Sequence, residues 1–395
     1  MIIRARAVVT MDGAPITNGA IAVSGNAIVD VGEWDSVRRR NSGEVVDLGE
    51  TALLPGLINA HCHLDYTCLR GRIARQDSFT DWIRAINAER AKLSADDYVR
   101  SIDVGFAEAR RFGTTSIANL TGVPELASRT HPLSRTWWFA ELIDIRAAQN
   151  VDEVLRTLPV SAEGRGLAPH APYTVSADLY RKCEAIAERE NLLLTTHLAE
   201  SKEEMAMSLD RCGPLSEFLV SISPDLFEAS GVTPVEHLSR FCGLDERWLL
   251  VHVNEIRDRD FERLGSAHIV HCPRSHGYFG HTPFEFAKLR SRGLNICLGT
   301  DSLASNDDLS LLAEMREFRK IQPSLSGFDL LEMVTINPAR ALRRAEDLGR
   351  LRVGYRADVI ALPQNGNEGD LVDEVIAFDG SVSWSMIDGV SLENA

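Results

Sequence analysis

The chain has 395 residues, of which 42 are Lys or Arg and 57 are Asp or Glu, so the formal net charge is −15. At roughly 100–200 residues per domain, this length predicts two or three domains, or one large barrel with an accessory module. The acidic excess argues against nucleic acid or an anionic membrane as the main partner, because both bind clustered Lys and Arg. Apolar residues make up 44% and charged residues 25%, which is typical of a soluble globular protein and not of a disordered one.

The seven cysteines are scattered and include no CxxC pair, which argues for a reducing compartment and against a disulfide framework. The first residues, MIIRARAVVTMDG, lack the long apolar run of a signal peptide. No segment approaches the ~18 consecutive apolar residues that a membrane helix needs. We therefore predict a soluble, cytoplasmic protein that binds no membrane.

Short strands and turns are expected in residues 1–50, where Asp12-Gly13 and Gly25-Asn26 are turn signals. The pattern then changes to near-continuous apolar runs, as expected for strands buried on both faces of a parallel sheet. Eight such runs occur along the chain, at residues 51–65, 114–121, 136–144, 166–173, 192–200, 248–255, 267–275 and 294–302.

Helical segments lie between most of these runs. Residues 98–113 have apolar residues at helical spacing and end on Gly113, a candidate C-cap. The segment SADLYRKCEAIAERE opens on Ser176, a good N-cap. Strand–helix alternation repeated eight times predicts an α/β fold, a (β/α)8 TIM-type barrel. Residues 201–247 are long for a connection of this kind and are expected to form a lid or an oligomer contact.

The C-terminal tail, with LGRLRVGYRADVIALPQ and EVIAFDGSVSWSMIDG, again has the pattern of strands and turns. It predicts a small β-sandwich domain that is built from both ends of the chain. The expected divisions are residues 1–52 and 344–395 for this small domain and residues 53–343 for the (β/α)8 barrel.

The polar residues that stand out in the barrel sit at the carboxyl ends of predicted strands, the rim that holds the active site in barrels of this type. His61 and His63 end the first strand, and alternate residues of a strand face the same side. His197 ends the fifth strand and Asp301 the eighth. Three imidazoles and a carboxylate suit one divalent ion, Zn²⁺ or Fe²⁺. A single HxH pair is a weak signal of metal binding. The prediction depends on the combination of HxH at the end of the first strand, HxxE at the fifth, His at the sixth and Asp at the eighth.

Four further residues are candidates for catalysis or substrate binding. Glu200 follows His197 by three residues and is expected to move protons as general base and acid, although a Glu at a helix start is the structural alternative. His252 ends the sixth strand and is expected to orient the hydroxide or polarise the substrate. His170 is expected to contact substrate or to be a turn residue between prolines. Trp82 is expected to stack on a planar ring or to pack in the core.

Weaker candidates lie near the same rim. Glu141 and Arg146 lie near the end of the third strand, and His281 could reach the pocket. Cys62 and Cys272 stand beside proposed ligands without a nucleophile–base pattern, so we interpret both as buried apolar residues. No GxxxxGK[ST] or GxGxxG motif is present.

Several motifs resemble those of the amidohydrolase superfamily. They are PGLINAHCHLD, HLAES, HCPRSH, LGTDSLASNDDLSLLAEMR and the terminal NPARAL with LGRLRVGYRADVI. The resemblance covers essentially the whole chain. It is strongest to the metal-dependent deaminases and chlorohydrolases of nitrogen heterocycles, which include guanine deaminase, aminodeoxyfutalosine deaminase and methylthioadenosine/S-adenosylhomocysteine deaminase. Binuclear relatives carry a carboxylated Lys at the end of strand four, where this chain reads GLAPHAPY.

The resemblance implies a single metal ion at the positions of His61, His63, His197 and Asp301. It implies Glu200 as proton shuttle and His252 as a partner of the hydroxide, while His170 matches a substrate contact of adenosine-type enzymes. The implied reaction is attack of metal-bound hydroxide on the ring carbon that bears an amine, with release of ammonia.

A hydrolase that releases chloride or cleaves a cyclic amide is the alternative, and a non-catalytic protein on a decayed barrel is a third. The expected partner is a small heterocyclic amine, and relatives suggest a homo-oligomer. The sequence does not identify the heterocycle.

Overall fold

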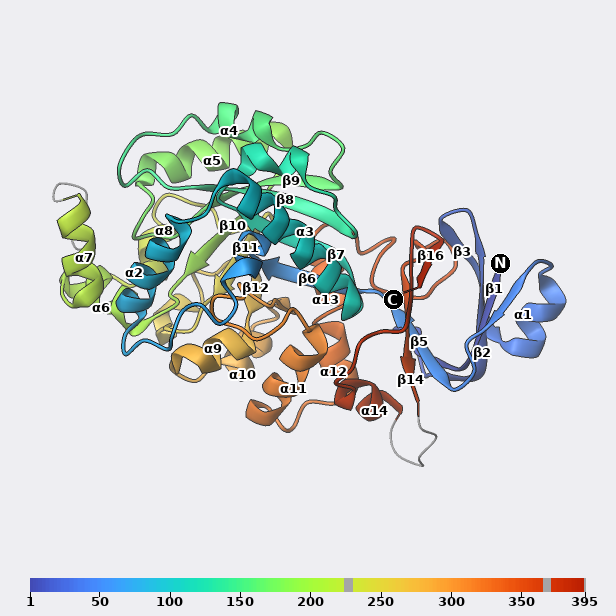
Figure 1. The fold of residues 1–395 in the computed structure, drawn as a ribbon. Helices are drawn as coiled ribbons and strands as arrows, with labels where there is room; N and C mark the ends of the chain where they lie inside the picture. The colour runs from blue at the N-terminus through green and yellow to red at the C-terminus, as the bar shows by residue number, and fades with distance from the viewer. Residues whose placement is uncertain (224–229, 365–370, 394–395) are drawn as a thin grey trace. The chain divides into compact units, whose positions relative to one another are not determined.

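The computed structural model describes residues 1–223, 230–364 and 371–393 of the chain (Figure 1). Within these residues the backbone forms two eight-stranded sheets, one mixed and one parallel. The chain divides into two compact units, one with residues 1–60, 107–117 and 309–395 and the other with residues 61–106 and 118–308. The domain boundaries drawn from the sequence, 1–52, 53–343 and 344–395, stay a prediction.

The mixed sheet is built from both ends of the chain, as predicted. Its strand order is β16-β15-β14-β5-β1-β2-β3, and β4 pairs with β1. The strands pair antiparallel except where β1 meets β4 and β5. Its strands are β1 (Ile2–Val8), β2 (Ile16–Ser24), β3 (Ala27–Glu33), β4 (Val45–Asp47), β5 (Thr51–Pro55), β14 (Val359–Pro363), β15 (Trp384–Ile387) and β16 (Val390–Glu393).

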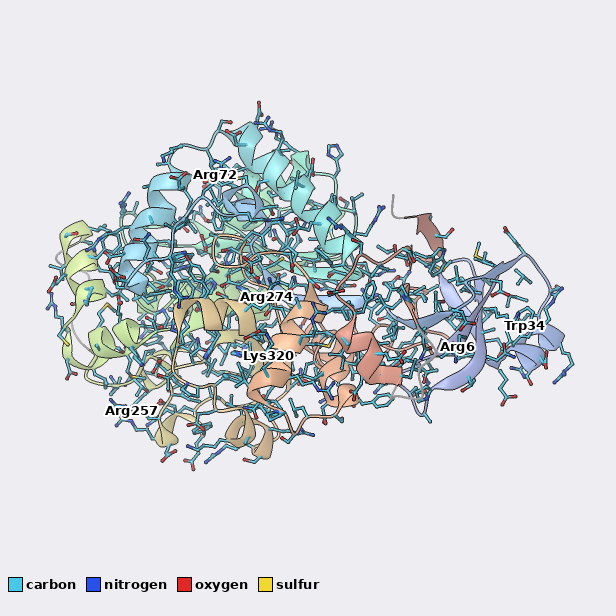
Figure 2. All side chains as sticks on the ribbon, turned by 60° about the horizontal axis from the view of Figure 1, so that its bottom comes forward. Arg6, Trp34, Arg72, Arg257, Arg274 and Lys320 are labelled. Atoms are coloured by element: carbon cyan, nitrogen blue, oxygen red, sulfur yellow. The ribbon has the colours of Figure 1, made fainter. Side chains whose placement is uncertain are left out.

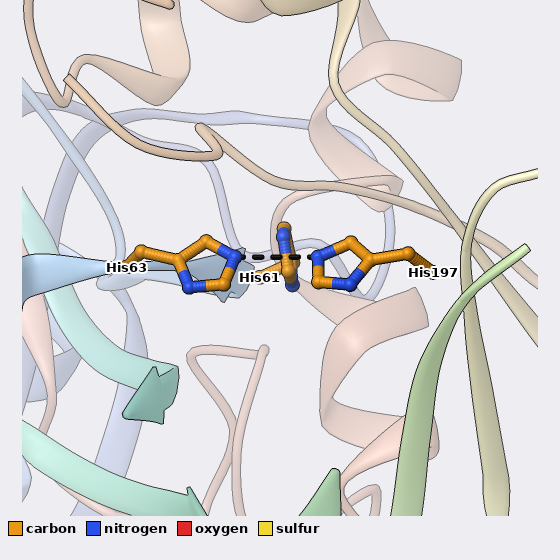
Figure 3. A group of neighbouring side chains, drawn as sticks. All are labelled: His61, His63 and His197. Carbon is orange, nitrogen blue, oxygen red and sulfur yellow. Dashed lines mark hydrogen bonds between the residues drawn. The ribbon is translucent and has the colours of Figure 1, made fainter. Parts of the chain in front are cut away.

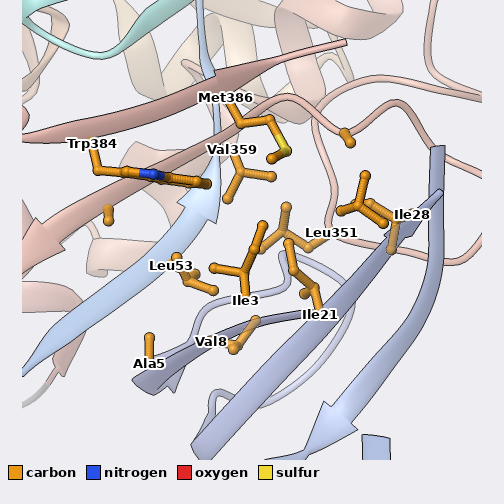
Figure 4. Packing of buried hydrophobic residues seen from close by; sticks show 13 residues of the cluster. Ile3, Ala5, Val8, Ile21, Ile28, Leu53, Leu351, Val359, Trp384 and Met386 are labelled. Carbon is orange, nitrogen blue, oxygen red and sulfur yellow. The ribbon is translucent and has the colours of Figure 1, made fainter. Parts of the chain in front are cut away.

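Apolar side chains from distant parts of the sequence form the core against this sheet (Figure 4). Ile3 of β1 pairs with Ile21 of β2, and both are fully buried. Val359 and Met386 of the C-terminal strands join the same cluster. Because β-branched and long apolar residues gain most from burial on a pleated surface, this shared core holds the two chain ends together.

The parallel sheet is the predicted barrel, with the strand order β13-β12-β11-β10-β9-β8-β7-β6. Cys62 and Asp301 form a parallel bridge, so the end of the last strand meets the end of the first. A side chain at Gly299 would lie 2.7 Å from the carbonyl oxygen of His61, which explains glycine at this close approach. Its strands are β6 (Leu57–Cys62), β7 (Thr114–Thr121), β8 (Arg135–Leu142), β9 (Gly164–Pro169), β10 (Leu193–Leu198), β11 (Trp248–His252), β12 (His268–His271) and β13 (Ile296–Leu298).

Helices connect the strands, and the predicted end signals are confirmed. Ser176 precedes α5, and its side-chain oxygen accepts a hydrogen bond from the backbone N–H of Leu179. Gly113 follows α3 in the left-handed region, with φ of 85°. The helices are α1 (Trp34–Arg40), α2 (Phe79–Arg90), α3 (Ala95–Arg111), α4 (Val151–Thr157), α5 (Ala177–Glu190), α6 (Lys202–Asp210), α7 (Pro214–Ile222), α8 (Pro234–Leu238), α9 (Pro273–Phe279), α10 (Phe286–Ser291), α11 (Leu311–Ile321), α12 (Gly327–Glu332), α13 (Ile336–Ala341) and α14 (Leu371–Ala377), with 3-10 helices η1 (Leu64–Leu69), η2 (Pro124–Arg129) and η3 (Asp258–Asp260).

One predicted strand is divided in the structure. The apolar run 51–65 was expected to be a single barrel strand, but β5 belongs to the mixed sheet and only β6 belongs to the barrel. Gly56 stands between them, and a Cβ at this position would lie 2.1 Å from Oγ1 of Thr115. The chain therefore passes from one sheet to the other at a glycine, without a polar residue to mark the change.

Charged side chains such as Arg72, Arg257 and Lys320 are exposed to solvent (Figure 2). All seven cysteines lie in the described residues and are free thiols, as predicted. Across residues 1–223, 230–364 and 371–393, no helix has the length and apolar character that crossing a bilayer requires.

The N-cap of α5 can be tested by stability. Replacing Ser176→Ala removes the acceptor for the N–H of Leu179 and should lower the free energy of unfolding by about 1 kcal/mol. Urea denaturation measures this loss. Ser176→Thr keeps a hydroxyl and should lose less, and an equal loss in both variants would contradict the capping role.

Candidate metal centre and active-site cavity

Three imidazoles meet at the carboxyl ends of β6 and β10. His61, His63 and His197 are buried, and one potential ligand atom of each lies within 4.8 Å of those of the others (Figure 3). The two Nε2 atoms of His63 and His197 are 3.2 Å apart. His61 is at the end of β6 with His63 two residues on, so the alternation of the strand brings both rings to one side.

Asp301 lies beside these three histidines. It follows β13 and pairs with Cys62 at the end of β6. Its Oδ1 is 3.6 Å from Nε2 of His61 and 3.9 Å from Nε2 of His63. Its Oδ2 accepts a hydrogen bond of 2.6 Å from Oγ of Ser275. One carboxylate oxygen is therefore held by a serine while the other faces the imidazoles, an arrangement that orients a metal-binding carboxylate. The structure thus brings together all four predicted ligand positions.

Burial controls the charge of these groups. Desolvation, followed by repulsion from the neighbouring imidazoles, lowers the pKa of His63 well below its usual value and that of His197 to about 3. Burial opposes ionisation of Asp301, but the hydrogen bond from His61 and the nearby imidazoles outweigh it and hold its pKa well below the usual range. At neutral pH the rings of His63 and His197 are therefore neutral and lie beside an ionised Asp301, the protonation state that metal binding needs.

The backbone of His170 fixes the ring of His197. The carbonyl of His170 accepts a hydrogen bond of 3.0 Å from Nδ1 of His197, which leaves the lone pair on Nε2. The side chain of His170 shares a hydrogen bond of 2.6 Å with Thr174 and lines the cavity described below. His170 thus lines the cavity, and its backbone carbonyl makes a contact that the sequence did not indicate.

Glu200 and His252 lie on the same side of the imidazole cluster. Oε1 of Glu200 is 3.6 Å from Nε2 of His252, and the ring of His252 stacks on that of His197 at 5.4 Å between centroids. Burial, reinforced by the charges of Asp301 and Glu204, raises the pKa of Glu200 well above its usual value. Burial lowers the pKa of His252 well below its usual value. Burial thus favours the protonated form of Glu200 and the neutral form of His252.

Buried side chains clamp the backbone of Glu200. Its N–H donates to Oε2 of Glu204 at 2.6 Å, and the N–H of Ala199 donates to Oε1 at 3.0 Å. Its carbonyl accepts from Nδ2 of Asn254 at 3.1 Å, and Oδ1 of Asn254 in turn pairs with Nδ1 of His276. Glu204 and Asn254 escaped the sequence analysis because their role is to hold another residue's backbone.

Positive backbone φ angles recur at these strand ends. Ala199, His252 and Asp301 have φ of 51°, 73° and 56°, values that L-amino acids rarely adopt. Backbone strain of this kind persists where surrounding contacts enforce it, and it concentrates at functional sites. Here the positive φ angles turn the chain sharply at the ends of β10 and β11 and after β13.

The cluster opens into one cavity of about 840 Å³. Its polar lining comprises His63, Tyr66, Arg84, Asn87, Arg90, Tyr98, Glu141, Arg146, His170, Thr174, His197, Glu200, His252, Asp301 and Ser302. Its apolar and aromatic lining includes Phe79, Trp82, Ile83, Ile86, Ile143, Ile145, Tyr173, Leu215, Phe218, Leu219 and Ile222. A volume of this size is typical of a pocket for a small organic ligand.

The weaker candidates divide between two cavities. Glu141 and Arg146 line the main cavity, as does Trp82, whose indole Nε1 donates to the carbonyl of Ala304 at 3.4 Å. His281 instead lines a second cavity of about 130 Å³. Cys62 and Cys272 are buried, as expected.

Two parts of the main cavity were missed. Helix α7 lies in the segment 201–247, predicted as a lid or oligomer contact, and it supplies four apolar wall residues, Leu215, Phe218, Leu219 and Ile222. Residues 224–229 of that segment lie outside the described residues. Arg90 also lines the cavity, and spacing could have found it, because residues 83, 86, 87 and 90 form one face of α2.

Comparison with known proteins identifies the family. A model of the amidohydrolase family matches residues 52–391. The chain belongs to this family. This amidohydrolase is 28% identical over 373 residues to the 5-methylthioadenosine/S-adenosylhomocysteine deaminase of Pyrococcus abyssi, covering 88% of this chain and 81% of that protein. It is 30% identical over 385 residues to the enzyme of the same name from Syntrophobacter fumaroxidans, covering 89% and 81%.

Solved structures confirm the fold of this amidohydrolase. An adenosine deaminase from Xanthomonas campestris with bound zinc superposes with a TM-score of 0.86 at 24% identity, covering 99% of this chain and 92% of that one. The aminofutalosine deaminase of Helicobacter pylori superposes with a TM-score of 0.86 at 20% identity, covering 99% of both chains.

The clamp on Glu200 predicts a stability effect. In Glu204→Gln one carboxylate acceptor becomes an NH₂ donor, so one buried backbone N–H loses its partner, and the free energy of unfolding should fall by about 1–3 kcal/mol. Glu217→Gln, an exposed change on α7, should stay within about 0.5 kcal/mol of the parent in the same urea titration. Equal stability of the two variants would contradict the clamp.

Proposed function

We propose that this amidohydrolase is a metal-dependent aminohydrolase that removes the exocyclic amine of a nitrogen heterocycle, a purine or adenosine-type nucleoside derivative, as ammonia. The decisive support is that three imidazoles gather beside Asp301, and that His63, His197, Asp301 and Glu200 line one cavity, in a chain whose curated relatives are named adenosine-type deaminases. The cavity offers a site for a flat ring as well as room for a substituent.

The residues fit a divalent cation. Neutral imidazole nitrogens and a carboxylate oxygen are the donors that Zn²⁺ prefers, and Fe²⁺ accepts the same set. We assign His61, His63, His197 and Asp301 as the groups that would hold one such ion, with zinc as the natural occupant. When bound, the ion makes water acidic enough to supply a hydroxide nucleophile at neutral pH.

The chain's own residues supply the proton transfers. Glu200 is buried with its pKa raised, so its protonated carboxyl can donate to the ring nitrogen as the amine-bearing carbon is attacked. The resulting carboxylate can then accept the proton of the hydroxyl group that the attack adds to the ring carbon and pass it to the amine, so that the carbon–nitrogen bond breaks, ammonia departs and a carbonyl forms. His252, neutral and 3.6 Å from Glu200, is placed to hydrogen-bond the attacking oxygen.

The remaining polar and aromatic residues position the ring. His170 lines the cavity and is held by Thr174, and burial lowers the pKa of its imidazole to about 3, so it acts as a neutral hydrogen-bonding group. Trp82 presents an aromatic surface on the cavity wall. We assign both to substrate binding. The small heterocyclic partner follows from this activity, while the cytoplasmic location and a homo-oligomeric state stay predictions.

The activity is tested by ammonia release. The zinc-loaded protein is expected to release ammonia from at least one of adenosine, methylthioadenosine, S-adenosylhomocysteine, aminodeoxyfutalosine and guanine. Glu200→Gln should keep the metal and lower kcat by about 10²- to 10⁴-fold, since an amide cannot exchange the proton. A variant with near-normal kcat would remove the assigned role of Glu200.

The ligand set is tested by metal content. His61→Ala removes one nitrogen donor and should reduce the zinc that stays with the protein through desalting, as measured by elemental analysis. His131→Ala, an exposed histidine paired with Asp103, should retain the full complement. Full occupancy in His61→Ala would exclude His61 from the ligand set.

A further inference from the structure

One polar corner of the main cavity has no part in the proton transfers proposed above. It lies over Gly122, directly after β7. A methyl carbon at Gly122 would lie 3.1 Å from Oε2 of Glu141, 3.4 Å from Nη2 of Arg90 and 3.5 Å from the hydroxyl of Tyr66. All three side chains line the cavity. The absent side chain of glycine thus leaves a space that polar atoms of three different elements surround.

The two charged groups of this corner are close but do not pair. Among the described residues, no carboxylate lies within 4.0 Å of the Arg90 guanidinium, and no cationic group lies within that distance of Glu141. Partly buried charges are normally neutralised by direct pairing, because desolvation is costly. A guanidinium and a carboxylate held on two sides of a gap are therefore arranged for a third group between them.

Stacking keeps Arg90 in place. Its guanidinium lies over the ring of Tyr66 at 5.1 Å, and that ring stacks on His63 at 5.7 Å with an interplanar angle of 22°. Arg90 is thus separated from the imidazole cluster by a single aromatic ring. A substrate ring at the cluster can reach the gap with its far edge or with a short substituent.

The floor of the gap is also fixed. The backbone N–H of Gly122 donates to Oδ2 of Asp65 at 2.8 Å, and the hydroxyl of Thr121 donates to the same oxygen at 3.1 Å. Asp65 is fully buried. Hydrogen bonds to a buried carboxylate are among the stronger ones in proteins, so Gly122 does not move to fill the gap.

We propose that Arg90 and Glu141 form a subsite for a neutral group of the substrate that accepts one hydrogen bond and donates another. A guanidinium only donates and an ionised carboxylate only accepts, so a group with both capacities satisfies the pair. An anion or a cation would be attracted by one wall and repelled by the other. Either a sugar hydroxyl or the lactam edge of an oxo-substituted ring has this chemistry. The inference rests on the proposed deaminase activity.

Three pairs of compounds distinguish the two sources. Adenosine is compared with 2′-deoxyadenosine and 3′-deoxyadenosine, which each lack one sugar hydroxyl. Guanine is compared with 2-aminopurine, which lacks the lactam. The zinc-loaded protein should prefer the complete compound in one of these pairs by about 10- to 100-fold in kcat/KM, the range for hydrogen bonds to charged groups.

Three variants then test the residues. Arg90→Gln and Glu141→Gln should each lower kcat/KM for the complete compound by about 10- to 100-fold and change that for its truncated partner by less than about threefold. Gly122→Ala fills the gap and leaves both charges in place, and no left-handed φ opposes alanine at this position. It should also abolish the preference, which keeps the test decisive if a charge variant fails to fold. Arg100→Gln, exposed on α3, is the control and should retain the preference.

Two results would overturn the subsite. One is an equal loss of kcat/KM for both members of each pair in Arg90→Gln and Glu141→Gln, and the other is no loss for either member. If the parent protein releases no ammonia from any compound, the proposed activity is wrong. Calorimetric measurement of the binding of the same compounds then tests the subsite independently of turnover. A binding preference that vanishes in both variants supports it, and equal binding of complete and truncated compounds excludes it.

Discussion

The site depends on one electrostatic condition, that three imidazoles can share a space of a few ångströms only when they are uncharged. Protonated rings at this separation would repel one another and would also lose their hydration. Burial meets the condition by lowering the pKa of His63 and His197. Burial opposes ionisation of Asp301, but the hydrogen bond from His61 and the neighbouring imidazoles outweigh it, so the pKa of Asp301 stays well below its usual range. The donor set is therefore prepared by the fold before any ion binds.

Bringing these residues together imposes a geometric demand on the backbone. The strand ends at Ala199, His252 and Asp301 adopt positive φ angles, which are costly for residues with a side chain. Buried hydrogen bonds offset this cost, as where Glu204 accepts from Ala199 and Glu200. The functional groups at the barrel rim thus rely on a second layer of polar residues behind them.

How far the sequence predicts this arrangement differs between the cluster and the cavity. The gathering of His61, His63, His197 and Asp301 at the barrel rim was predictable because each ends a β-rich apolar run, and strand periodicity places His61 and His63 on one side. The division of residues 51–65 into β5 and β6 at Gly56 could not be predicted. Strands of both sheets have the same apolar pattern, and hydropathy does not reveal which sheet a strand joins. The cavity wall from α7 was also missed, since it depends on contacts between distant segments. Arg90 could have been predicted as a cavity residue, because helical spacing places it on the same face of α2 as Ile83 and Ile86.

The balance of charge in the cavity differs from that of the whole chain. The chain carries a formal charge of −15, yet three arginines and three carboxyl groups line the cavity, namely Arg84, Arg90, Arg146, Glu141, Glu200 and Asp301. A cavity that followed the overall charge would favour cations. The mixture of arginines and carboxyl groups in the lining, together with the apolar wall from α7, instead favours an uncharged heterocycle with room for an apolar substituent. The carboxyl groups of the cavity also lie apart, with Asp301 at the imidazoles and Glu141 opposite Arg90. The acidic excess therefore lies mainly on the solvated surface, and the chemistry of the cavity is determined by a few charges held apart.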